Sequence, residues 1–348
     1  MNIFLDNGYC DIKSILSEPY SFIWIIGGRG TGKTYTTLKT VYEEKIKFMF
    51  LRRNQNQIDK VANPAMMPFK KLNEDNGWNV TIAPVVKDVY GAYESDIEDG
   101  KLKPKGLPLG LFSALSTFAN LRGFDGSDIK LLIWDEFIPQ IGERPLKSEA
   151  EAFLNAYETI NRNRELEGEE PLKFIGLSNS NTAASDTFLY LGLTPVIEKM
   201  RQKGMRVWKN EKRSTLIVDL GESEISEKKK HTVLYQMAAG TEYSGMALEN
   251  DFVSDDFSNI ASHPIKEYYP YAFVGELCIY HHKSKSEWYV CQLAIGTPRF
   301  SYPDTAAGKE KFRRDHISMV DHFLARKIFF KDFYCKKSLT KLLGLANM

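Results

Sequence analysis

The sequence of 348 residues has few cysteines, no long apolar run and almost no net charge. Its four cysteines are scattered and form no CxxC pair or Cys/His cluster, so neither a disulfide framework nor a zinc site is indicated, and a reducing compartment is expected. The apolar runs fall far short of the ~20 residues that cross a bilayer. The N-terminus also lacks the pattern of a signal peptide. We therefore expect neither membrane insertion nor secretion.

The net charge of +1 conceals a local excess of positive charge near the C-terminus. Between residues 309 and 341 there are ten Lys or Arg and four Asp or Glu. A basic patch of this kind can attract a polyanion such as nucleic acid, although a solvated helix face would give the same pattern. The candidates for nucleic-acid contact are Lys309, Lys311, Arg313, Arg314, Arg326 and Lys327.

The first ~200 residues alternate short apolar runs with helical patterns, which predicts an α/β domain with a parallel sheet covered by helices. Helices are expected from Thr34 onward and over 148–165, where Ser148 and Glu151 have the spacing of a capping box. Several short Gly- and Pro-containing strands at 84–112 suggest a hairpin insertion. Strands buried on both faces are expected at 22–26, 46–51, 131–134 and 172–177.

The pattern changes after residue 210, which predicts three segments. Residues 1–210 would form the larger α/β domain. Residues 211–247, with a strand at 214–220 and a charged helix at 222–237, would form a linker or lid. Residues 248–348, with strands at 271–280 and 288–294 and a long basic helix at 308–330, would form a small α+β domain.

Residues 27–34 read GGRGTGKT and match the P-loop pattern of Gly, four residues, Gly-Lys and Ser/Thr. The glycines let successive backbone N–H groups point at phosphate oxygens, and the following helix adds its positive end. Lys33 would reach the β- and γ-phosphates of ATP, and Thr34 would bind Mg²⁺. The alternative is a glycine-rich turn without a ligand. The predicted nucleotide-binding residues are Gly27, Gly28, Arg29, Gly30, Thr31, Gly32, Lys33 and Thr34.

Two further strand ends carry polar groups suited to this chemistry. Asp135 follows the apolar run at 131–134 and could hold Mg²⁺ through water. Because successive strand residues face opposite sides, Glu136 would point elsewhere and act as a general base on the attacking water. Ser178 and Asn179 end the strand at 172–177 and could sense the γ-phosphate, unless they form an ordinary turn.

Arginines near the end of the 148–165 helix are candidates for a finger inserted into a neighbouring subunit's site. Arg162 and Arg164 lie two residues apart and do not share a helix face, so only one is expected to enter a given site. A solvated helix end would favour arginine as well. Further candidates are Arg29 and Arg122, and also Arg52 and Arg53, which could form salt bridges or touch the nucleotide.

These motifs together resemble the DNA-packaging (encapsidation) ATPases of small podoviruses with protein-primed linear genomes. Those proteins are compact relatives of the large terminases, in the additional-strand, RecA-like group of P-loop NTPases. The resemblance covers residues ~20–255. It rests on GGRGTGKT, FMFLRR (48–53), IWDEF (133–137), NRNRE (161–165), LSN (177–179) and GTEYSGMALENDF (240–252).

The resemblance implies a motor that uses ATP hydrolysis to drive double-stranded DNA into a preformed prohead in the host cytoplasm. It further implies a homomeric, pentameric ring joined to the portal (connector) through a packaging RNA. Lys33, Asp135 and Glu136 match the P-loop lysine, the metal carboxylate and the catalytic glutamate. Arg162 matches the trans-acting arginine. The RG of LRGFDG (121–126) matches the pattern of the large terminases, so Arg122 is a candidate for a second basic residue at the subunit interface, and Arg164 is another.

Large terminases carry an RNase H-like nuclease in their second domain, and such an activity needs several acids around two metal ions. Here the strands expected at 271–280 and 288–294 contain a single acidic residue, Glu276. Asp251, Asp255 and Asp256 lie in a loop-like stretch. An RNase H-like domain without nuclease activity is therefore expected, with its basic tail bound to an RNA or DNA backbone.

Two other classes of protein remain compatible with the P-loop itself. One is another mechanical ATPase, such as a helicase or a partition motor. The other is a nucleotide-dependent binding switch or a small-molecule kinase, which would need no arginine from a neighbour.

Overall fold

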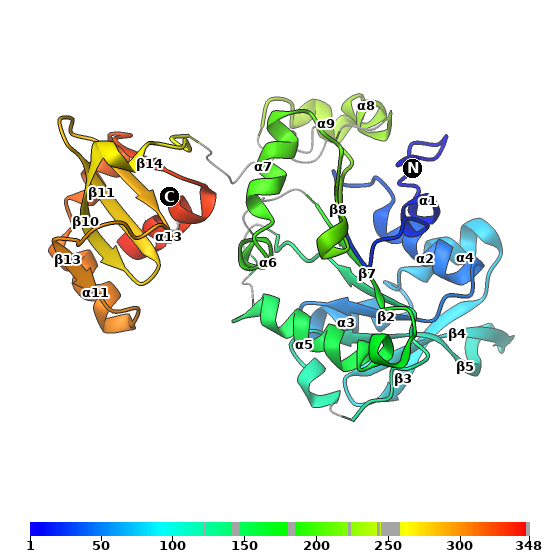
Figure 1. The fold of residues 1–348 in the computed structure, drawn as a ribbon. Coiled ribbons are helices and arrows are strands. Elements are labelled where there is room, and N and C mark those ends of the chain that lie inside the picture. Colours follow the sequence, from blue (N-terminus) through cyan, green and yellow to red (C-terminus); the bar gives the residue numbers. More distant parts are fainter. Residues whose placement is uncertain are drawn as a thin grey trace. The chain divides into compact units, whose positions relative to one another are not determined.

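The computed structural model describes residues 1–121, 123–140, 143, 146–179, 185–221, 224–241, 244 and 258–345. The chain forms two compact units. The first comprises Met1–Leu191 and Val196–Ser254, and the second comprises Gly192–Pro195 and Asp255–Met348. Each unit has its own sheet, and each is described separately below (Figure 1).

In the described part of the first unit, one sheet has nine strands in the order β3-β4-β5-β2-β6-β7-β1-β9-β8. The six adjacent strands β5, β2, β6, β7, β1 and β9 pair in parallel. The strands β3, β4 and β8 are antiparallel to their neighbours. The predicted α/β class and the four predicted strands are confirmed. The bounds are β1 (Phe22–Ile26), β2 (Phe48–Arg52), β3 (Val80–Val86), β4 (Val89–Glu98), β5 (Lys101–Ala114), β6 (Leu131–Asp135), β7 (Lys173–Ser178), β8 (Val207–Asn210) and β9 (Thr215–Asp219).

Central strands are apolar throughout because both faces of the sheet are covered. On β1, Ile23 and Ile25 pack into a core with Leu38 of a helix, whereas Trp24 faces the opposite layer and contacts the rings of Phe153 and Phe174. The helices of this unit are α1 (Ile12–Leu16), α2 (Lys33–Glu43), α3 (Gln55–Ala62), α4 (Phe69–Asn76), α5 (Glu149–Asn161), α6 (Asp186–Tyr190), α7 (Thr194–Gln202), α8 (Glu224–Lys230) and α9 (Val233–Met237).

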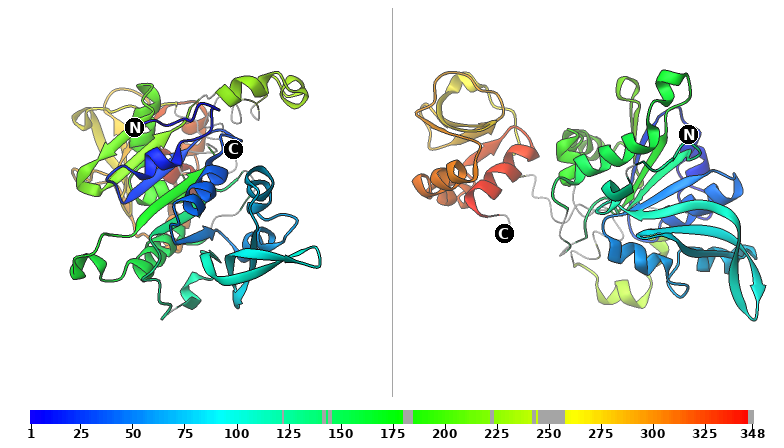
Figure 2. Two further views of the ribbon diagram at one scale, coloured as in Figure 1. Left: turned by 90° about the vertical axis from the view of Figure 1, so that its right-hand side faces the viewer. Right: turned by 90° about the horizontal axis from the view of Figure 1, so that it is seen from below.

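The predicted hairpin insertion is confirmed as the antiparallel strands β3, β4 and β5. Figure 2 shows the β4–β5 hairpin in teal, projecting from the sheet. Residues 110–114 of β5 then pair in parallel with β2, so the insertion is continuous with the main sheet.

The elements around 148 and 211–237 differ from the expectation. Ser148 has φ 54° and its side chain caps nothing, so the predicted capping box is wrong, and α5 ends at Asn161. The strand assigned to the linker is β9, which pairs with β1 inside the sheet, so the linker cannot begin at 211. The single charged helix is in fact α8 and α9, because Thr232 between them adopts an extended backbone.

In the second unit, five strands pair in the order β13-β10-β11-β12-β14 within the described residues. α11 and α13 cover one face of this sheet, where Ile279, Val290, Phe312 and Leu339 form the core (Figures 1 and 2). The bounds are β10 (Tyr268–Val274), β11 (Leu277–His282), β12 (Trp288–Cys291), β13 (Phe300–Tyr302), α11 (Ala306–Asp315), α12 (Met319–Leu324), β14 (Ile328–Phe330) and α13 (Phe333–Leu343).

Two predictions for this unit are wrong. The strand expected at 271–280 is a hairpin of β10 and β11 that turns at Gly275, whose φ of 57° favours glycine. The long helix expected at 308–330 is divided into α11, α12 and β14. It ends because residues 328–330 pair with β12 and Arg326 adopts a φ of 55°.

Within the part of the chain that the structure describes, no helix combines the length and the apolar character that a bilayer crossing requires. The likeness of the second unit to RNase H-type nucleases stays a prediction. Asp251, Asp255 and Asp256 lie outside the described residues, as does most of the 240–252 motif.

Candidate nucleotide-binding site

The P-loop joins the end of β1 to the start of α2. Gly30 and Gly32 adopt φ of 78° and 77°, which glycine accepts without strain. Thr31 is fully buried and donates its hydroxyl hydrogen to the carbonyl of Gly28 at 3.0 Å. The turn leads directly into the first N–H groups of α2. These groups have no partner within the helix and favour an anion.

Lys33 begins α2 and turns its side chain back over this loop. Its Nζ donates to the carbonyl oxygens of Gly27 and Gly28 at 2.9 Å and to Asn179 Oδ1 at 3.3 Å. Burial lowers the pKa of Lys33 to about 8 from an ordinary 10.5, while the nearby Cys10 and Asp135 oppose that shift. Phosphate oxygens at this position would favour the charged ammonium.

Thr34 and Asp135 meet where α2 begins and β6 ends. Thr34 Oγ1 donates to Asp135 Oδ1 at 2.9 Å, and Asp135 is 2% exposed. A hydroxyl and a carboxylate are the hard oxygen ligands that Mg²⁺ prefers, and Mg²⁺ keeps several waters and phosphate oxygens as its other ligands. Thr34 and Asp135 could therefore supply the protein ligands of a nucleotide-bound Mg²⁺.

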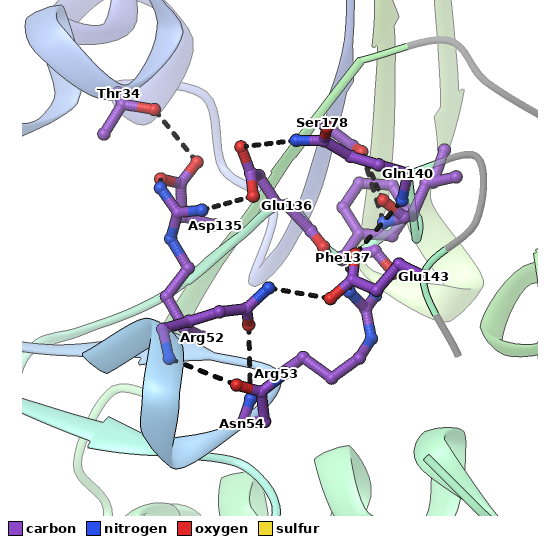
Figure 3. Close-up of polar contacts among 12 residues, drawn as sticks. Thr34, Arg52, Arg53, Asn54, Asp135, Glu136, Phe137, Gln140, Glu143 and Ser178 are labelled. Atoms are coloured by element: carbon purple, nitrogen blue, oxygen red, sulfur yellow. Dashed lines mark hydrogen bonds and ion pairs between the residues drawn. The ribbon is translucent and has the colours of Figure 1, made fainter. Parts of the chain in front are cut away.

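Arg52 bridges the two acidic residues, as Figure 3 shows. Its Nη2 lies 2.6 Å from Asp135 Oδ2, and its Nη1 pairs with Glu136 Oε2. The contact arises because β2 and β6 are adjacent parallel strands, so Arg52 at the end of β2 faces the end of β6. The sequence left open whether Arg52 forms salt bridges or touches the nucleotide, because the strand order was unknown.

Glu136 departs from the alternation expected of a strand. β6 ends at Asp135, and Glu136 adopts φ 59°, so the prediction that the two carboxylates face opposite sides is wrong. Both line one cavity, and Gln140 Nε2 donates to Glu136 Oε1 at 3.2 Å. The candidate metal ligand, Asp135, and the candidate base, Glu136, therefore face the same cavity.

Arg53 points into the protein and supports the loop that follows β6 (Figure 3). It is 1% exposed, pairs with Glu149 and with Glu143 at 3.0 Å, and donates to the carbonyls of Glu136 and Phe137 at 3.1 and 3.0 Å. Burial raises the pKa of Glu149, an effect that Arg53 opposes. Arg53 is thus a structural residue that positions the backbone of Glu136.

The cavity beside the P-loop has a volume of about 220 Å³. Residues 30–35 line one part of it, and Asp135, Glu136, Ser178 and Asn179 line the rest. Ser178 also fixes the loop after β6, since its Oγ accepts a hydrogen bond from Ile138 N at 3.2 Å. The structure thus brings Ser178 and Asn179 to the site, and their coupling role stays a prediction.

The candidate finger arginines differ in exposure. Arg162 lies at the end of α5 with its side chain 48% exposed, and it donates to the carbonyl of Phe124. Arg164 is 6% exposed and donates to the carbonyls of Gly126 and Ser127 at 2.9 and 3.0 Å. Arg164 therefore supports the 126–127 loop and leaves Arg162 as the exposed member of the pair. Arg122 lies outside the described residues.

Two contacts at the P-loop were not foreseen. Lys229 of α8 donates to the carbonyl of Arg29 at 2.7 Å, and Cys10 N donates to the carbonyl of Thr31 at 2.9 Å. Arg29 itself donates to Gln140 at 3.1 Å. Residues 10 and 229 are far from the motif in sequence, and no local pattern marks them.

The six basic residues predicted to contact nucleic acid are exposed, but they do not share one helix. Lys309, Lys311, Arg313 and Arg314 lie on α11, and Arg326 and Lys327 precede β14. Lys309 pairs with Asp304 at 2.5 Å. Their contact with nucleic acid stays a prediction.

The mostly parallel sheet, the glycine turn at the end of β1 and the Thr34–Asp135 pair define a P-loop nucleotide-binding fold. The profile of the podovirus DNA encapsidation proteins (Gp16) matches residues 6–279, and the chain belongs to this family. The resemblance inferred from the motifs is thereby confirmed.

Relatives at modest identity carry the name DNA packaging protein. That of Bacillus phage B103 is 26% identical over 253 residues, which cover 69% of this chain and 67% of the relative. That of Bacillus phage phi29 is 25% identical over 255 residues, covering 70% and 65%. The aligned region thus spans about two thirds of each relative.

Two solved structures share the fold over nearly the whole chain. One is "The bacteriophage Phi-29 viral genome packaging motor assembly", with a TM-score of 0.66, 19% identity and coverage of 99% of this chain and 100% of that one. The other is "The Phi-28 gp11 DNA packaging Motor", with a TM-score of 0.61, 16% identity and coverage of 97% of each chain.

Proposed function

We propose that this protein is the ATP-driven motor that moves double-stranded viral DNA into a prohead, with ATP hydrolysed at the P-loop. The observation that carries the proposal is the convergence of Lys33, Thr34, Asp135 and Glu136 on one cavity in a member of the encapsidation family. The names of the relatives support DNA as the cargo.

The side chains divide the chemistry among them. Lys33 binds the β- and γ-phosphates, and Thr34 and Asp135 hold the Mg²⁺ that neutralises phosphate charge. Glu136 orients the attacking water and accepts its proton. Arg52 keeps the two carboxylates at a fixed separation, so that one serves the metal and the other serves the water.

Arg162 completes the site of a neighbouring subunit in a homomeric ring, which we propose to be a pentamer. Its exposed guanidinium would exchange its contacts with the Phe124 carbonyl and Asp125 for the charge that develops on the transferred phosphoryl group of the neighbour. The second unit carries exposed lysines and arginines that suit a nucleic-acid backbone, either DNA or a packaging RNA that joins the ring to the portal. No nuclease activity is proposed for that unit.

Binding and hydrolysis of Mg-ATP by Lys33→Ala and Glu136→Gln variants test the proposal. Lys33→Ala should lose both binding and hydrolysis. Glu136→Gln should bind ATP normally and hydrolyse it at least ~100-fold more slowly, since a general base contributes about that much or more. Full hydrolysis by either variant would refute the assigned site.

A further inference from the structure

The cavity at the P-loop is lined by groups of two chemical kinds. Asp135, Glu136 and Asn179 are polar and suit the γ-phosphate and the attacking water. Tyr35, in the first turn of α2, adds an aromatic ring to the same lining. An aromatic ring in a cavity that takes a nucleoside triphosphate suits the nucleobase, because bases stack on aromatic side chains.

A second tyrosine, from the N-terminal segment, lies beside Tyr35. The ring centroids of Tyr9 and Tyr35 are 5.9 Å apart with an interplanar angle of 55°. Tyr9 also packs directly on the P-loop, since a Cβ added at Gly32 would lie only 2.7 Å from its Cγ. Both tyrosines are half-buried, so each ring is partly accessible.

Hydrogen bonds hold the backbone around Tyr9 and the ring of Tyr35 in place. Tyr9 is followed by Cys10, whose N–H binds the carbonyl of Thr31 at 2.9 Å, and the Tyr9 carbonyl accepts from Leu5 N at 2.8 Å. Tyr35 donates its hydroxyl hydrogen to Asp75 Oδ2 at 2.9 Å. The Tyr35 ring and the backbone of Tyr9 are therefore held relative to the phosphate-binding loop, and the Tyr9 ring packs against Gly32 and Tyr35, which lowers the entropic cost of binding.

We propose that Tyr9 and Tyr35 form the nucleobase platform of this site, on which the base of the bound nucleoside triphosphate stacks. The inference rests on the proposed function, because it presumes a triphosphate at Lys33. Aromatic stacking of a base tolerates different bases, since every base has a π-face. Removing one ring should weaken nucleotide binding about 5- to 150-fold, the range measured for such stacks.

The test compares a non-hydrolysable ATP analogue with tripolyphosphate, each bound with Mg²⁺ to the full chain in a calorimeter. Tyr9→Leu and Tyr35→Leu, which keep apolar volume, should lose analogue affinity by that factor and keep tripolyphosphate affinity within about twofold. Tyr9→Phe and Tyr35→Phe are the matched controls, because each keeps the aromatic ring. Tyr9→Phe should bind both ligands as the unmodified protein does, and Tyr35→Phe, which loses only the hydrogen bond to Asp75, should lose far less analogue affinity than Tyr35→Leu. Thermal unfolding confirms that each variant is folded.

The ratio of the two affinities decides the outcome. An unchanged ratio in both leucine variants, whether both affinities stay or both fall, would overturn the platform, because the rings would then act only on the loop or not at all. Lys33→Ala should abolish binding of both ligands. If Lys33→Ala left both affinities intact, the proposed function itself would fail, and that outcome is distinct from failure of the platform.

Discussion

At the scale of single residues, two consecutive arginines have opposite surroundings: Arg52, the last residue of β2, and Arg53, which follows it. Arg52 reaches the cavity and holds Asp135 and Glu136, whereas Arg53 turns inward to Glu143 and Glu149. Alternation along a strand explains why neighbours face opposite sides. The sequence alone shows only two adjacent arginines, and assigning each its partners required knowing that β6 lies beside β2.

Replacing Arg52 should impair hydrolysis more than nucleotide binding. Arg52→Ala removes the cation between two adjacent carboxylates, so Glu136 loses its position and kcat should fall about 10- to 100-fold, part of a general base's contribution. Arg52→Lys should give an intermediate rate, because one ammonium lacks the planar fork that spans both acids. Steady-state ATPase assays and equilibrium ATP binding measure the two effects. Unchanged turnover by Arg52→Ala would remove Arg52 from the account.

Replacing Arg53 should instead destabilise the first unit. Arg53→Met leaves Glu149, whose side chain is 1% exposed, as a buried charge without its partner, a change that costs about 3–5 kcal/mol. The double variant Arg53→Met/Glu149→Leu should recover most of that loss, since apolar side chains can replace a buried pair. Urea unfolding followed by circular dichroism tests both. A single variant as stable as the parent would show that the buried pair contributes little.

At the scale of elements, the strands around the P-loop were predictable because each is a short apolar run buried on both faces. The P-loop was also predictable, because its conformation depends on glycines within the motif itself. The wrongly predicted elements depend instead on contacts between residues far apart in the sequence. β14 is a strand because residues 328–330 pair with β12 across some forty residues of chain, and β9 belongs to the sheet because it pairs with β1. The position of Glu136 depends on a backbone turn that no periodicity reveals.

The end of α11 provides a pH-dependent element. His316 is buried against the hydroxyls of Tyr302, at 2.8 Å, and Tyr271, at 3.3 Å. Burial lowers the pKa of His316 below its ordinary 6.5, and the nearby Asp315 opposes that shift. Between the folded and unfolded pKa values the unfolded chain binds more protons, so the stability of the second unit should fall as the pH drops through and below 6.5.

Urea midpoints measured between pH 8 and pH 5 test this dependence. Trp288 lies in the second unit, and a Trp288→Phe variant identifies its transition by fluorescence. His316→Gln keeps a polar side chain without a titrating ring and should flatten the profile. His231→Gln, at an exposed position, is the matched control and should follow the parent. Identical profiles for the parent and His316→Gln would exclude His316 as the cause.

At the scale of the whole molecule, the proposed site is shared between subunits. Arg162 has an exposed guanidinium and, in the described residues, no place in the cavity of its own chain. The sequence offered Arg162 and Arg164 equally until the resemblance favoured Arg162, and burial of Arg164 now gives a physical reason for that choice. The two compact units separate the phosphate chemistry from the exposed basic residues near the C-terminus.

Mixing two inactive variants tests the shared site. Lys33→Ala subunits lack a working P-loop but keep Arg162, whereas Arg162→Ala subunits keep the P-loop. Under conditions in which the protein assembles, the mixture should hydrolyse ATP faster than the sum of the two separate samples. Mixing Lys33→Ala with Glu136→Gln is the matched control and should restore no ATP hydrolysis. Both residues belong to the P-loop side of the shared site, so every site in this mixture lacks one of them. No gain in the first mixture would argue against an arginine supplied in trans.

The most direct measurement of the central claim is ATP-dependent protection of linear double-stranded DNA from nuclease in the presence of proheads. The unmodified protein should protect DNA when ATP and Mg²⁺ are supplied. Glu136→Gln should still bind ATP but protect no DNA, because ATP binding without hydrolysis does not drive DNA movement. DNA protected equally well by Glu136→Gln, or by the unmodified protein without ATP, would contradict the account.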